Sequence, residues 1–179
     1  MSKLLAGTSI LVPVFCWRNM YSLKIYEIDS NYVRFLSDFQ EHIFCSEGEK
    51  ALRKYIGIIL EIKGFKYFAP LSSFKPKHEK MQEAVDFIKI KDYAVININN
   101  MIPVPEGMFN LVDINRTKDP HYKFLLQAEN REINRQKNRI LKNAAIVYSH
   151  KINNGEGTSL SKRTNDFIKL EKACRAYMS

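Results

Sequence analysis

The fold is decided by the stretch Lys54-Tyr-Ile-Gly-Ile-Ile-Leu-Glu-Ile62-Lys-Gly64-Phe-Lys-Tyr-Phe-Ala69. Two apolar runs, residues 54–62 and 65–69, flank the dipeptide Lys63-Gly64, and the glycine can supply the positive φ that a tight turn requires. The stretch therefore predicts a β-hairpin. Because the first run is apolar almost throughout rather than alternating, we expect it to form a central strand that is covered on both faces.

Apolar patterns outside this hairpin predict the rest of an antiparallel sheet. Residues 23–28 alternate with period two, residues 87–98 contain a second hairpin around Lys91-Asp92, and residues 101–104 form a short edge strand interrupted by Pro103. Apolar residues at helical spacing after Asp29 or Ser30 predict a short helix. We therefore expect an α+β fold, in which helices pack on an antiparallel sheet of about five or six strands.

One long helix is predicted to begin at Asp119-Pro120, an N-cap followed by proline at the first helical position. Its apolar face continues to Tyr148, while a second face carries basic residues at i, i+4, i+8 and i+11. A straight helix lines these up as one basic stripe, which either binds phosphates or is only a solvated surface. The stripe consists of Arg131, Arg135, Arg139 and Lys142. Residues 151–162 then predict a flexible polar loop before a last helix over residues 163–177.

The charge balance limits the class of partner. The 179 residues include 28 Lys and Arg against 19 Asp and Glu, and this net charge of +9 favours a polyanion, either nucleic acid or an acidic membrane surface. Residues 116–151 hold nine basic and three acidic residues, so most of the excess lies there. With 45% hydrophobic residues, the composition excludes a disordered chain and fits one globular domain.

Residues 1–19 differ from the rest of the chain. Residues 4–17 are mostly apolar, but Pro13 interrupts them and they are shorter than the roughly 20 residues that span a bilayer. We expect residues 1–19 to be an N-terminal extension outside the fold and residues 20–179 to form a single domain; a membrane-associated protein that uses residues 4–17 is an alternative. Cys16, Cys45 and Cys174 are too far apart for a disulfide framework or a zinc knuckle, which indicates a cytoplasmic protein.

The sequence lacks the usual motifs for metal and nucleotide chemistry. It contains no His-x-x-x-His, no Cys-x-x-Cys, no acidic cluster and no glycine-rich phosphate loop. Its four histidines are scattered, and only His78 lies beside a candidate site. Metal-assisted phosphodiester hydrolysis is therefore disfavoured, and we expect neither a metal ion nor a cofactor.

The candidate site follows the predicted hairpin. In the run Lys66-Tyr-Phe-Ala-Pro70-Leu-Ser-Ser-Phe-Lys-Pro-Lys77, an apolar strand is expected to break at proline into two hydroxyls and two lysines. RNA can be cleaved without metal by its own 2′-OH if the protein orients the phosphate and stabilises its extra charge. Lys75 would neutralise the pentacovalent phosphorane, while Ser73, with Ser72, would hydrogen-bond a non-bridging oxygen or relay a proton. From these residues alone, a proline-flanked turn with serines capping backbone groups is the more ordinary interpretation.

Four segments, in this order, carry a resemblance to a known family. They are Leu23-Lys-Ile-Tyr-Glu-Ile-Asp-Ser-Asn-Tyr-Val-Arg-Phe-Leu36, Tyr55-Ile-Gly-Ile-Ile-Leu-Glu-Ile62, Tyr67-Phe-Ala-Pro-Leu-Ser-Ser-Phe-Lys75 and Met101-Ile-Pro-Val104. The chain resembles the ToxN/AbiQ family of type III toxin–antitoxin endoribonucleases, from about Leu23 through the helix after Pro120. The resemblance implies a strongly twisted sheet, similar to the barrel of the MazF/Kid toxins.

The resemblance also implies the site. Ser72, Ser73 and Lys75 match the family's hydroxyl and lysine positions, and the place of a further active-site lysine holds Arg53, with Lys54 beside it. Some members carry a tyrosine in the preceding loop, whereas residues 45–50 contain none. We expect Lys77 to charge the rim of the site. The basic stripe, together with Arg116 and Lys118, is predicted to bind RNA.

The activity implied by the resemblance is metal-independent, sequence-selective RNA cleavage that leaves a 2′,3′-cyclic phosphate. The implied partners are a small pseudoknotted RNA antitoxin, which the toxin processes and which inhibits it in a protein–RNA hetero-oligomer, and cellular and phage RNA substrates. Several such toxins abort phage infection. A different class remains open: a non-catalytic basic protein that sequesters a structured RNA.

Overall fold

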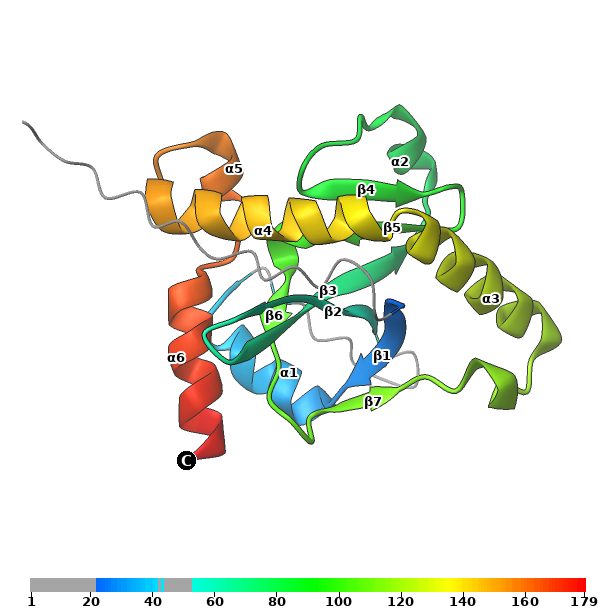
Figure 1. Ribbon diagram of the computed structural model, residues 1–179, viewed down its shortest axis with the longest axis horizontal. Coiled ribbons are helices and arrows are strands. Elements are labelled where there is room, and N and C mark those ends of the chain that lie inside the picture. Colours follow the sequence, from blue (N-terminus) through cyan, green and yellow to red (C-terminus); the bar gives the residue numbers. More distant parts are fainter. Residues whose placement is uncertain (1–21, 42, 44–52) are drawn as a thin grey trace, which may run out of the picture.

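The computed structural model describes residues 22–41, 43 and 53–179, and these residues form one seven-stranded antiparallel sheet with helices packed on it (Figure 1). The strand order is β4-β5-β3-β2-β1-β7, and β6 pairs with β3 outside this path. The strands are β1 (Lys24–Ile28), β2 (Lys54–Ile62), β3 (Phe65–Ser73), β4 (Phe87–Ile90), β5 (Ala94–Asn97), β6 (Ile102–Pro103) and β7 (Phe109–Leu111). The predicted α+β class and the antiparallel sheet are confirmed.

Three of the helices begin after an aspartate N-cap. The Asp29 side chain accepts hydrogen bonds from Asn31 N and Tyr32 N, and Asp119 caps α3 in the same way. The helices are α1 (Ser30–Ser37), α2 (Pro76–Lys80), α3 (Pro120–Arg135), α4 (Lys137–Asn154), α5 (Ser159–Lys162) and α6 (Phe167–Met178), with 3₁₀ turns η1 (Ile98–Asn100) and η2 (Ile114–Arg116).

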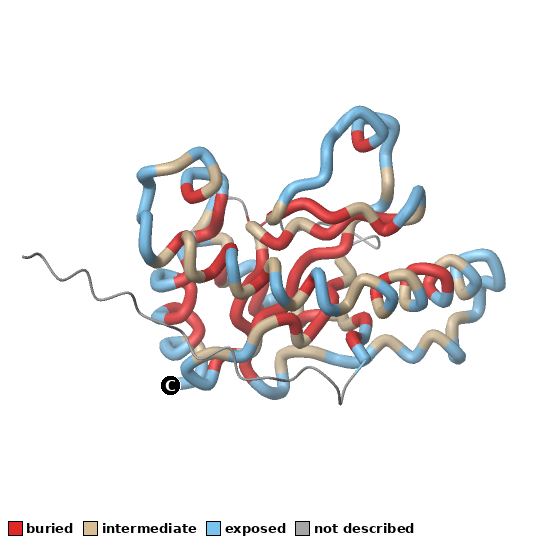
Figure 2. Tube along the Cα trace, turned by 45° about the horizontal axis from the view of Figure 1, so that its top comes forward, coloured by how far each residue is buried: buried red, intermediate tan, exposed pale blue. Residues whose placement is uncertain are grey.

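The hairpin predicted from residues 54–69 is the centre of the molecule. Strands β2 and β3 pair antiparallel around Lys63-Gly64, and Gly64 has the positive φ (80°) that the turn requires. One face of the hairpin is covered by α4 and α6, where Tyr67 and Tyr148 both donate hydrogen bonds to Glu171 Oε1 (2.8 and 2.7 Å). Figure 2 shows the buried segments gathered where the sheet meets these helices.

Strand β3 continues through Pro70 instead of breaking there. Pro70 pairs with Tyr55 of β2, and the strand runs on to Ser73. On the other side of β3, pairing with β6 ends at Phe68 and pairing with β5 begins at Leu71. Proline is tolerated because it lies between these two ladders, at a position where β3 pairs with neither β5 nor β6. The serines therefore belong to the strand, and the predicted break at Pro70 was wrong.

The predicted barrel is not confirmed, because the sheet is open. The path ends at β4 on one side and β7 on the other, and these two strands do not pair with each other within the described ranges. Strand β3 instead branches the sheet, since its first half pairs with β6 and its last three residues pair with β5. The predicted five or six strands fell short of seven because β7 has only three residues, too few to show alternation.

The single long helix predicted after Pro120 is two helices. Gln136 is both the C-cap of α3 and the N-cap of α4, with φ −93° and ψ 7°, and the two helices run in different directions (Figure 1). The Gln136 side chain donates to the Lys89 carbonyl (3.0 Å), which ties the junction to β4. The apolar pattern continues across the junction because both helices pack on the same sheet, so the pattern alone concealed the break.

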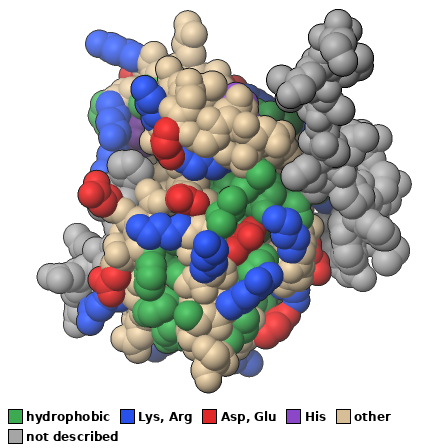
Figure 3. Space-filling view, turned by 90° about the vertical axis from the view of Figure 1, so that its left-hand side faces the viewer, with side chains coloured by type: hydrophobic (Ala, Val, Ile, Leu, Met, Phe, Trp, Pro, Cys, Tyr) green, Lys and Arg blue, Asp and Glu red, His purple; other side chains and the backbone are tan. Residues whose placement is uncertain are grey.

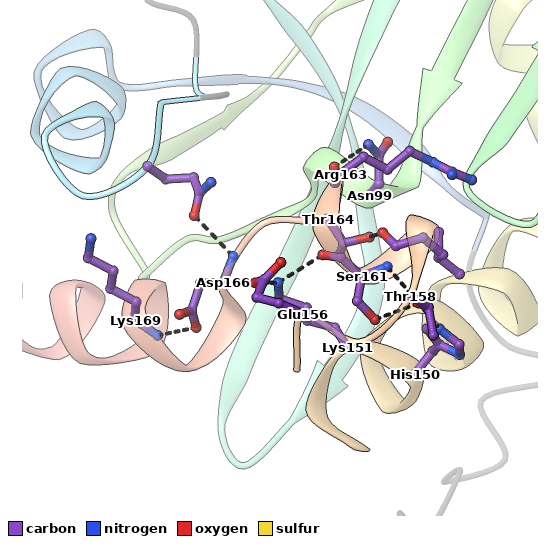
Figure 4. Close-up of polar contacts among 12 residues, drawn as sticks. Asn99, His150, Lys151, Glu156, Thr158, Ser161, Arg163, Thr164, Asp166 and Lys169 are labelled. Carbon is purple, nitrogen blue, oxygen red and sulfur yellow. Dashed lines mark hydrogen bonds and ion pairs between the residues drawn. The ribbon is translucent and has the colours of Figure 1, made fainter. Parts of the chain in front are cut away.

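Residues 151–162 also differ from the predicted loop. Helix α4 runs on to Asn154 and the short α5 follows, and side chains tie the segment together (Figure 4). The buried Lys151 Nζ contacts Glu156 and donates to the Ser161 carbonyl (2.8 Å), while His150 and Thr158 form a hydrogen bond (2.8 Å). The polar residues thus satisfy one another and hold an ordered connection.

The remaining sequence expectations concern the ends of the chain and its cysteines. Residues 1–19, Met20, Cys16 and Cys45 lie outside the described residues, so the domain boundary stays a prediction. Cys174 is 1% exposed on α6, and burial raises the pKa of its thiol. No helix in the described part of the chain is long and apolar enough to cross a bilayer.

Candidate active site

The end of the central hairpin brings the predicted catalytic residues together. The last β2–β3 pair is Tyr55 with Pro70, so Arg53 and Ser72 each lie two residues beyond the same rung. Lys54 is the first residue of β2, and Ser73 is the last of β3. The two pairs of residues are about 20 apart in sequence. They lie at one end of the hairpin because β3 runs antiparallel to β2, so the end of β3 lies beside the start of β2.

Strand alternation divides these residues between the two faces of the sheet. Successive side chains of a strand point to opposite faces, so Ser72 and Ser73 point in opposite directions. Ser73 lies on the face of Leu71, which α4 and α6 cover further along, and it is exposed, whereas Ser72 is half-buried. Lys75 follows in extended backbone (φ −132°, ψ 156°) and is exposed on the Ser73 side. The two hydroxyls therefore cannot have equivalent roles.

Lys54 and Arg53 also point to opposite faces of the sheet. Glu27 of β1 is the cross-strand partner of Lys54, and the Lys54 ammonium group forms an ion pair with the Glu27 carboxylate. This lysine shares the Ser73 face but is already neutralised. Arg53 alternates onto the Ser72 face, is half-buried, and precedes β2 directly.

Lys75 is fixed by His78. The Lys75 N–H donates to His78 Nδ1 (3.0 Å), and His78 N–H donates to the Lys75 carbonyl (2.8 Å). The imidazole lies against the rings of Phe74 and Phe87 and is 6% exposed. Burial, and then the charges of nearby lysines, lower the pKa of His78. His78 therefore acts as a neutral acceptor that orients the backbone of Lys75, and no hydrogen bond links its ring to Ser72 or Ser73.

Helix α3 adds a residue that the sequence reasoning missed. Glu129 is buried, and its desolvation raises the pKa of its carboxyl group to about 7. Burial, and then the nearby carboxylates of Glu129 and Glu27, raise the pKa of Tyr122. The sequence could have indicated the burial of Glu129, because this residue falls at helical spacing on the same face as the apolar residues Tyr122, Leu126 and Ile133.

The predicted basic stripe is divided by the break at Gln136. Arg131 and Arg135 are on α3 beside the β4–β5 turn, whereas Arg139 and Lys142 are on α4, and Arg139 donates to Glu83 (3.0 Å). The four residues do not form one continuous row, and that part of the prediction was wrong. Arg116, which pairs with Asp113, and Lys118 and Lys77 are exposed.

The side of the molecule that carries α5 and α6 bears charges of both signs. Figure 3 shows acidic side chains among the basic ones there, with hydrophobic side chains between them. Residues 116–151, which include α3 and most of α4, carry nine basic and three acidic residues. Among residues 22–41, 43 and 53–179, no group of three or more His, Cys, Asp and Glu side chains could hold a metal ion.

Comparison with known families covers almost the whole described chain. The family model of the toxin ToxN of type III toxin–antitoxin systems matches residues 24–175. The chain belongs to the ToxN family. The resemblance inferred from the four sequence segments is therefore confirmed, and the matched range contains Ser72, Ser73 and Lys75.

Curated ToxN-family relatives are endoribonucleases. The chain is 28% identical to endoribonuclease ToxN of Bacillus thuringiensis subsp. kurstaki over 86% of this chain and 84% of the relative. It is 33% identical to endoribonuclease ToxN of Pectobacterium atrosepticum over 58% of this chain and 67% of that relative. It is 25% identical to endoribonuclease AbiQ of Lactococcus lactis subsp. lactis over 87% and 90%.

Solved structures of ToxN-family proteins share the fold. One, from work on selective toxin inhibition by a non-coding RNA pseudoknot, has a TM-score of 0.79 at 26% identity and covers 89% of this chain and 99% of its own. Another, from work on a processed non-coding RNA that regulates a bacterial antiviral system, has a TM-score of 0.76 at 26% identity and covers 87% and 99%. The chain therefore shares its overall fold with these two structures.

Proposed function

We propose that this ToxN-family chain is a cytoplasmic toxin that cleaves RNA without a metal ion. The proposal is supported by Ser73 and Lys75, which are exposed and two residues apart at the end of the central hairpin, where Lys54 begins the neighbouring strand. The curated relatives, which are named endoribonucleases, support the same reaction class.

The proposed reaction is an intramolecular transesterification. The 2′-oxygen of the RNA attacks the adjacent phosphorus, and the bond to the 5′-oxygen of the next nucleotide breaks. The products are a 2′,3′-cyclic phosphate and a 5′-OH; the proton of the 2′-OH passes to water, and the 5′-oxygen receives a proton from Lys75. Ser73 Oγ donates a hydrogen bond to a non-bridging oxygen, and the Lys75 ammonium group neutralises the phosphorane and can protonate the leaving oxygen.

We assign the other predicted residues to binding. Ser72 and Arg53 lie on the opposite face of the sheet end, where an arginine can hold a neighbouring phosphate but is a poor proton carrier because of its high pKa. Lys77, Arg116, Lys118 and the arginines of α3 and α4 supply further positive charge toward an RNA strand.

The proposed partners follow those of the structural neighbours. One neighbour is associated with inhibition by an RNA pseudoknot, and another with a processed RNA in an antiviral system. We infer that a small structured RNA antitoxin inhibits this chain, that the chain processes the precursor, and that the two assemble into a protein–RNA complex. Cellular and phage RNA are the inferred substrates.

Substitution of Ser73 tests the active site. We expect Ser73→Ala to lower the single-turnover cleavage rate by about 10²–10³-fold, the typical loss for one transition-state donor. Ser72→Ala is the matched control, because it removes the same group from the other face, and it should cost less than tenfold. Cleavage is followed with a labelled RNA whose product ends are analysed for 2′,3′-cyclic phosphate, in the presence of EDTA.

Two outcomes would contradict this proposal. A Ser73→Ala protein that cleaved at the wild-type rate would remove Ser73 from the site. Salt-sensitive RNA binding by the wild-type chain, with no cyclic-phosphate product from RNA or from the antitoxin precursor, would instead favour the non-catalytic RNA-binding protein.

A further inference from the structure

A small basic pocket lies beside the candidate active site, between the β4–β5 turn and α3. It has a volume of about 130 Å³ and is lined by Lys91, Tyr93, Ala128, Arg131, Glu132 and Arg135. The two walls are about 40 residues apart in sequence. They meet because the Gln136 side chain anchors the C-terminal end of α3 to the backbone of β4.

Strand pairing places one wall of this pocket near the segment that joins Ser73 to Lys75. Ser73 pairs with Ala94 of β5, and the following residue, Phe74, donates its N–H to the Tyr93 carbonyl (3.0 Å). Tyr93 is therefore a pocket residue that is hydrogen-bonded to the segment joining Ser73 to Lys75. Neighbouring strands lie about 4.8 Å apart, so the backbone of this pocket residue lies about one strand spacing from that of Phe74.

The charges of the lining favour an anion. Lys91, Arg131 and Arg135 supply three positive charges, and Glu132 supplies one negative charge. Glu132 is 11% exposed and already interacts with Arg135 (3.3 Å) and Lys91 (3.9 Å), whereas the side chains of those cations are 73% and 51% exposed. The carboxylate thus holds two cations at the rim of the pocket, and their net positive charge remains available to a ligand.

We propose that this pocket binds a phosphate group of the RNA strand, adjacent to the phosphate that is cleaved at Ser73. The inference rests on the proposed function and deepens it, because it joins Arg131 and Arg135 of the predicted stripe to Lys91 and Tyr93, which were not among the predicted residues. Two arginines offer paired donors to phosphate oxygens, and Lys91 adds a point charge. The phosphate can belong to a substrate strand or to an inhibitory RNA, because both present the same group.

The test uses the full chain with Arg131→Gln/Arg135→Gln, and Lys91→Asn as a second variant. Asparagine suits Lys91 because this residue has φ 51°, in the left-handed region that asparagine adopts more readily than most residues. Lys172→Gln is the matched control, since Lys172 is an exposed lysine on α6 far from the pocket in sequence. Thermal unfolding shows whether each variant keeps its fold.

We expect the double variant to raise the RNA concentration for half-maximal single-turnover cleavage about tenfold or more, with the rate at saturating RNA near wild type. The slope of log K against log salt should become shallower by about 0.7 for the lost phosphate contact. Lys91→Asn should shift both quantities in the same direction, and Lys172→Gln should leave them near wild type.

The same titrations in a Ser73→Ala background measure binding without cleavage, so the pocket is tested even if the chain does not cleave RNA. Wild-type affinity and salt slope in the pocket variants would overturn the inference while leaving the proposed reaction intact. A wild-type chain that forms no cyclic phosphate, yet loses affinity in the pocket variants, would retain the pocket and overturn the reaction. If the pocket variants lose affinity only for a single-stranded oligomer, the phosphate belongs to a substrate strand. If they lose affinity only for a structured repeat-derived RNA, it belongs to an inhibitory RNA.

Discussion

At the scale of single residues, Glu129 shows how burial changes an ionisable group. Its carboxyl has no ion pair or hydrogen bond within the described chain, and burial raises its pKa from 4.5 to about 7. The folded state therefore holds this proton more tightly than the unfolded state does. Its destabilising effect is absent well below pH 4.5, grows as the pH rises, and is complete above pH 7.

We predict that Glu129→Gln stabilises the protein at pH 8 by up to about 3 kcal/mol, at 1.36 kcal/mol per unit of pKa shift, because glutamine carries no charge to bury. The gain should nearly vanish at pH 4.5. Urea unfolding at both pH values measures it, with Glu79→Gln as the exposed control. An equal gain at both pH values would show that the charge of Glu129 is not the cause.

His78 gives a second prediction, because its imidazole acts through Lys75. His78→Ala removes the acceptor of the Lys75 N–H and should lower RNA cleavage about tenfold, while His78→Asn can keep an oxygen acceptor and should retain more activity. The lowered pKa means that the neutral form is favoured in the fold, so its contribution is present above pH 6.5 and is lost as the pH falls further. The acid loss of activity measured across a pH series should be smaller in His78→Asn. Equal cleavage by the two variants would exclude this positioning role.

At the scale of elements, β2 contains a glycine that the hairpin needs for close packing. A Cβ atom on Gly57 would overlap the ring of Phe68 on β3. We predict that Gly57→Ala costs about 1–3 kcal/mol of unfolding free energy, the usual range for overpacking. Adding Phe68→Leu should recover part of this loss in a double-mutant cycle measured by chemical denaturation; additive losses would show that the two side chains do not compete for space.

The elements that the sequence predicted correctly are those whose turn residues, caps and apolar patterns all lie within one short segment. The hairpin at 54–69 could be predicted from its turn glycine and apolar runs, and α1 from the Asp29 cap. The break at Gln136 could not, because it depends on a hydrogen bond to Lys89, 47 residues away. For the same reason the candidate site was predicted as a set of residues, but not its division between faces, which required β3 to continue through Pro70.

At the scale of the whole molecule, one ion pair joins the β4–β5 hairpin to the C-terminal helices. Arg163 Nε and Nη2 donate to the two oxygens of Asp86 (2.6 and 2.9 Å), and the Asp86 side chain is 5% exposed. The neighbouring Asn99 extends the junction by donating to the Arg163 carbonyl and accepting from Asn165 N–H. Sequence spacing could not indicate this contact, because its partners are 77 residues apart.

We predict that Arg163→Ala destabilises the fold by about 3 kcal/mol, since it leaves a buried carboxylate unpaired. Arg163→Ala with Asp86→Asn should be less destabilising than Arg163→Ala alone, because no buried charge remains. Unfolding free energies of the four proteins in the cycle measure the coupling. If the double variant were the least stable, the cost would come from lost packing rather than from the unpaired charge.

Chemical modification of the buried Cys174 thiol can measure how often α6 separates from the sheet. Its thiol is buried and its pKa is raised by burial, so little thiolate is present and a water-borne alkylating reagent cannot reach it in the packed state. The rate of modification at this position therefore reports how often α6 lifts from the sheet. With Cys16 and Cys45 replaced by serine, Cys174 is the one remaining thiol, and its modification rate measures the opening of the molecule with and without bound RNA.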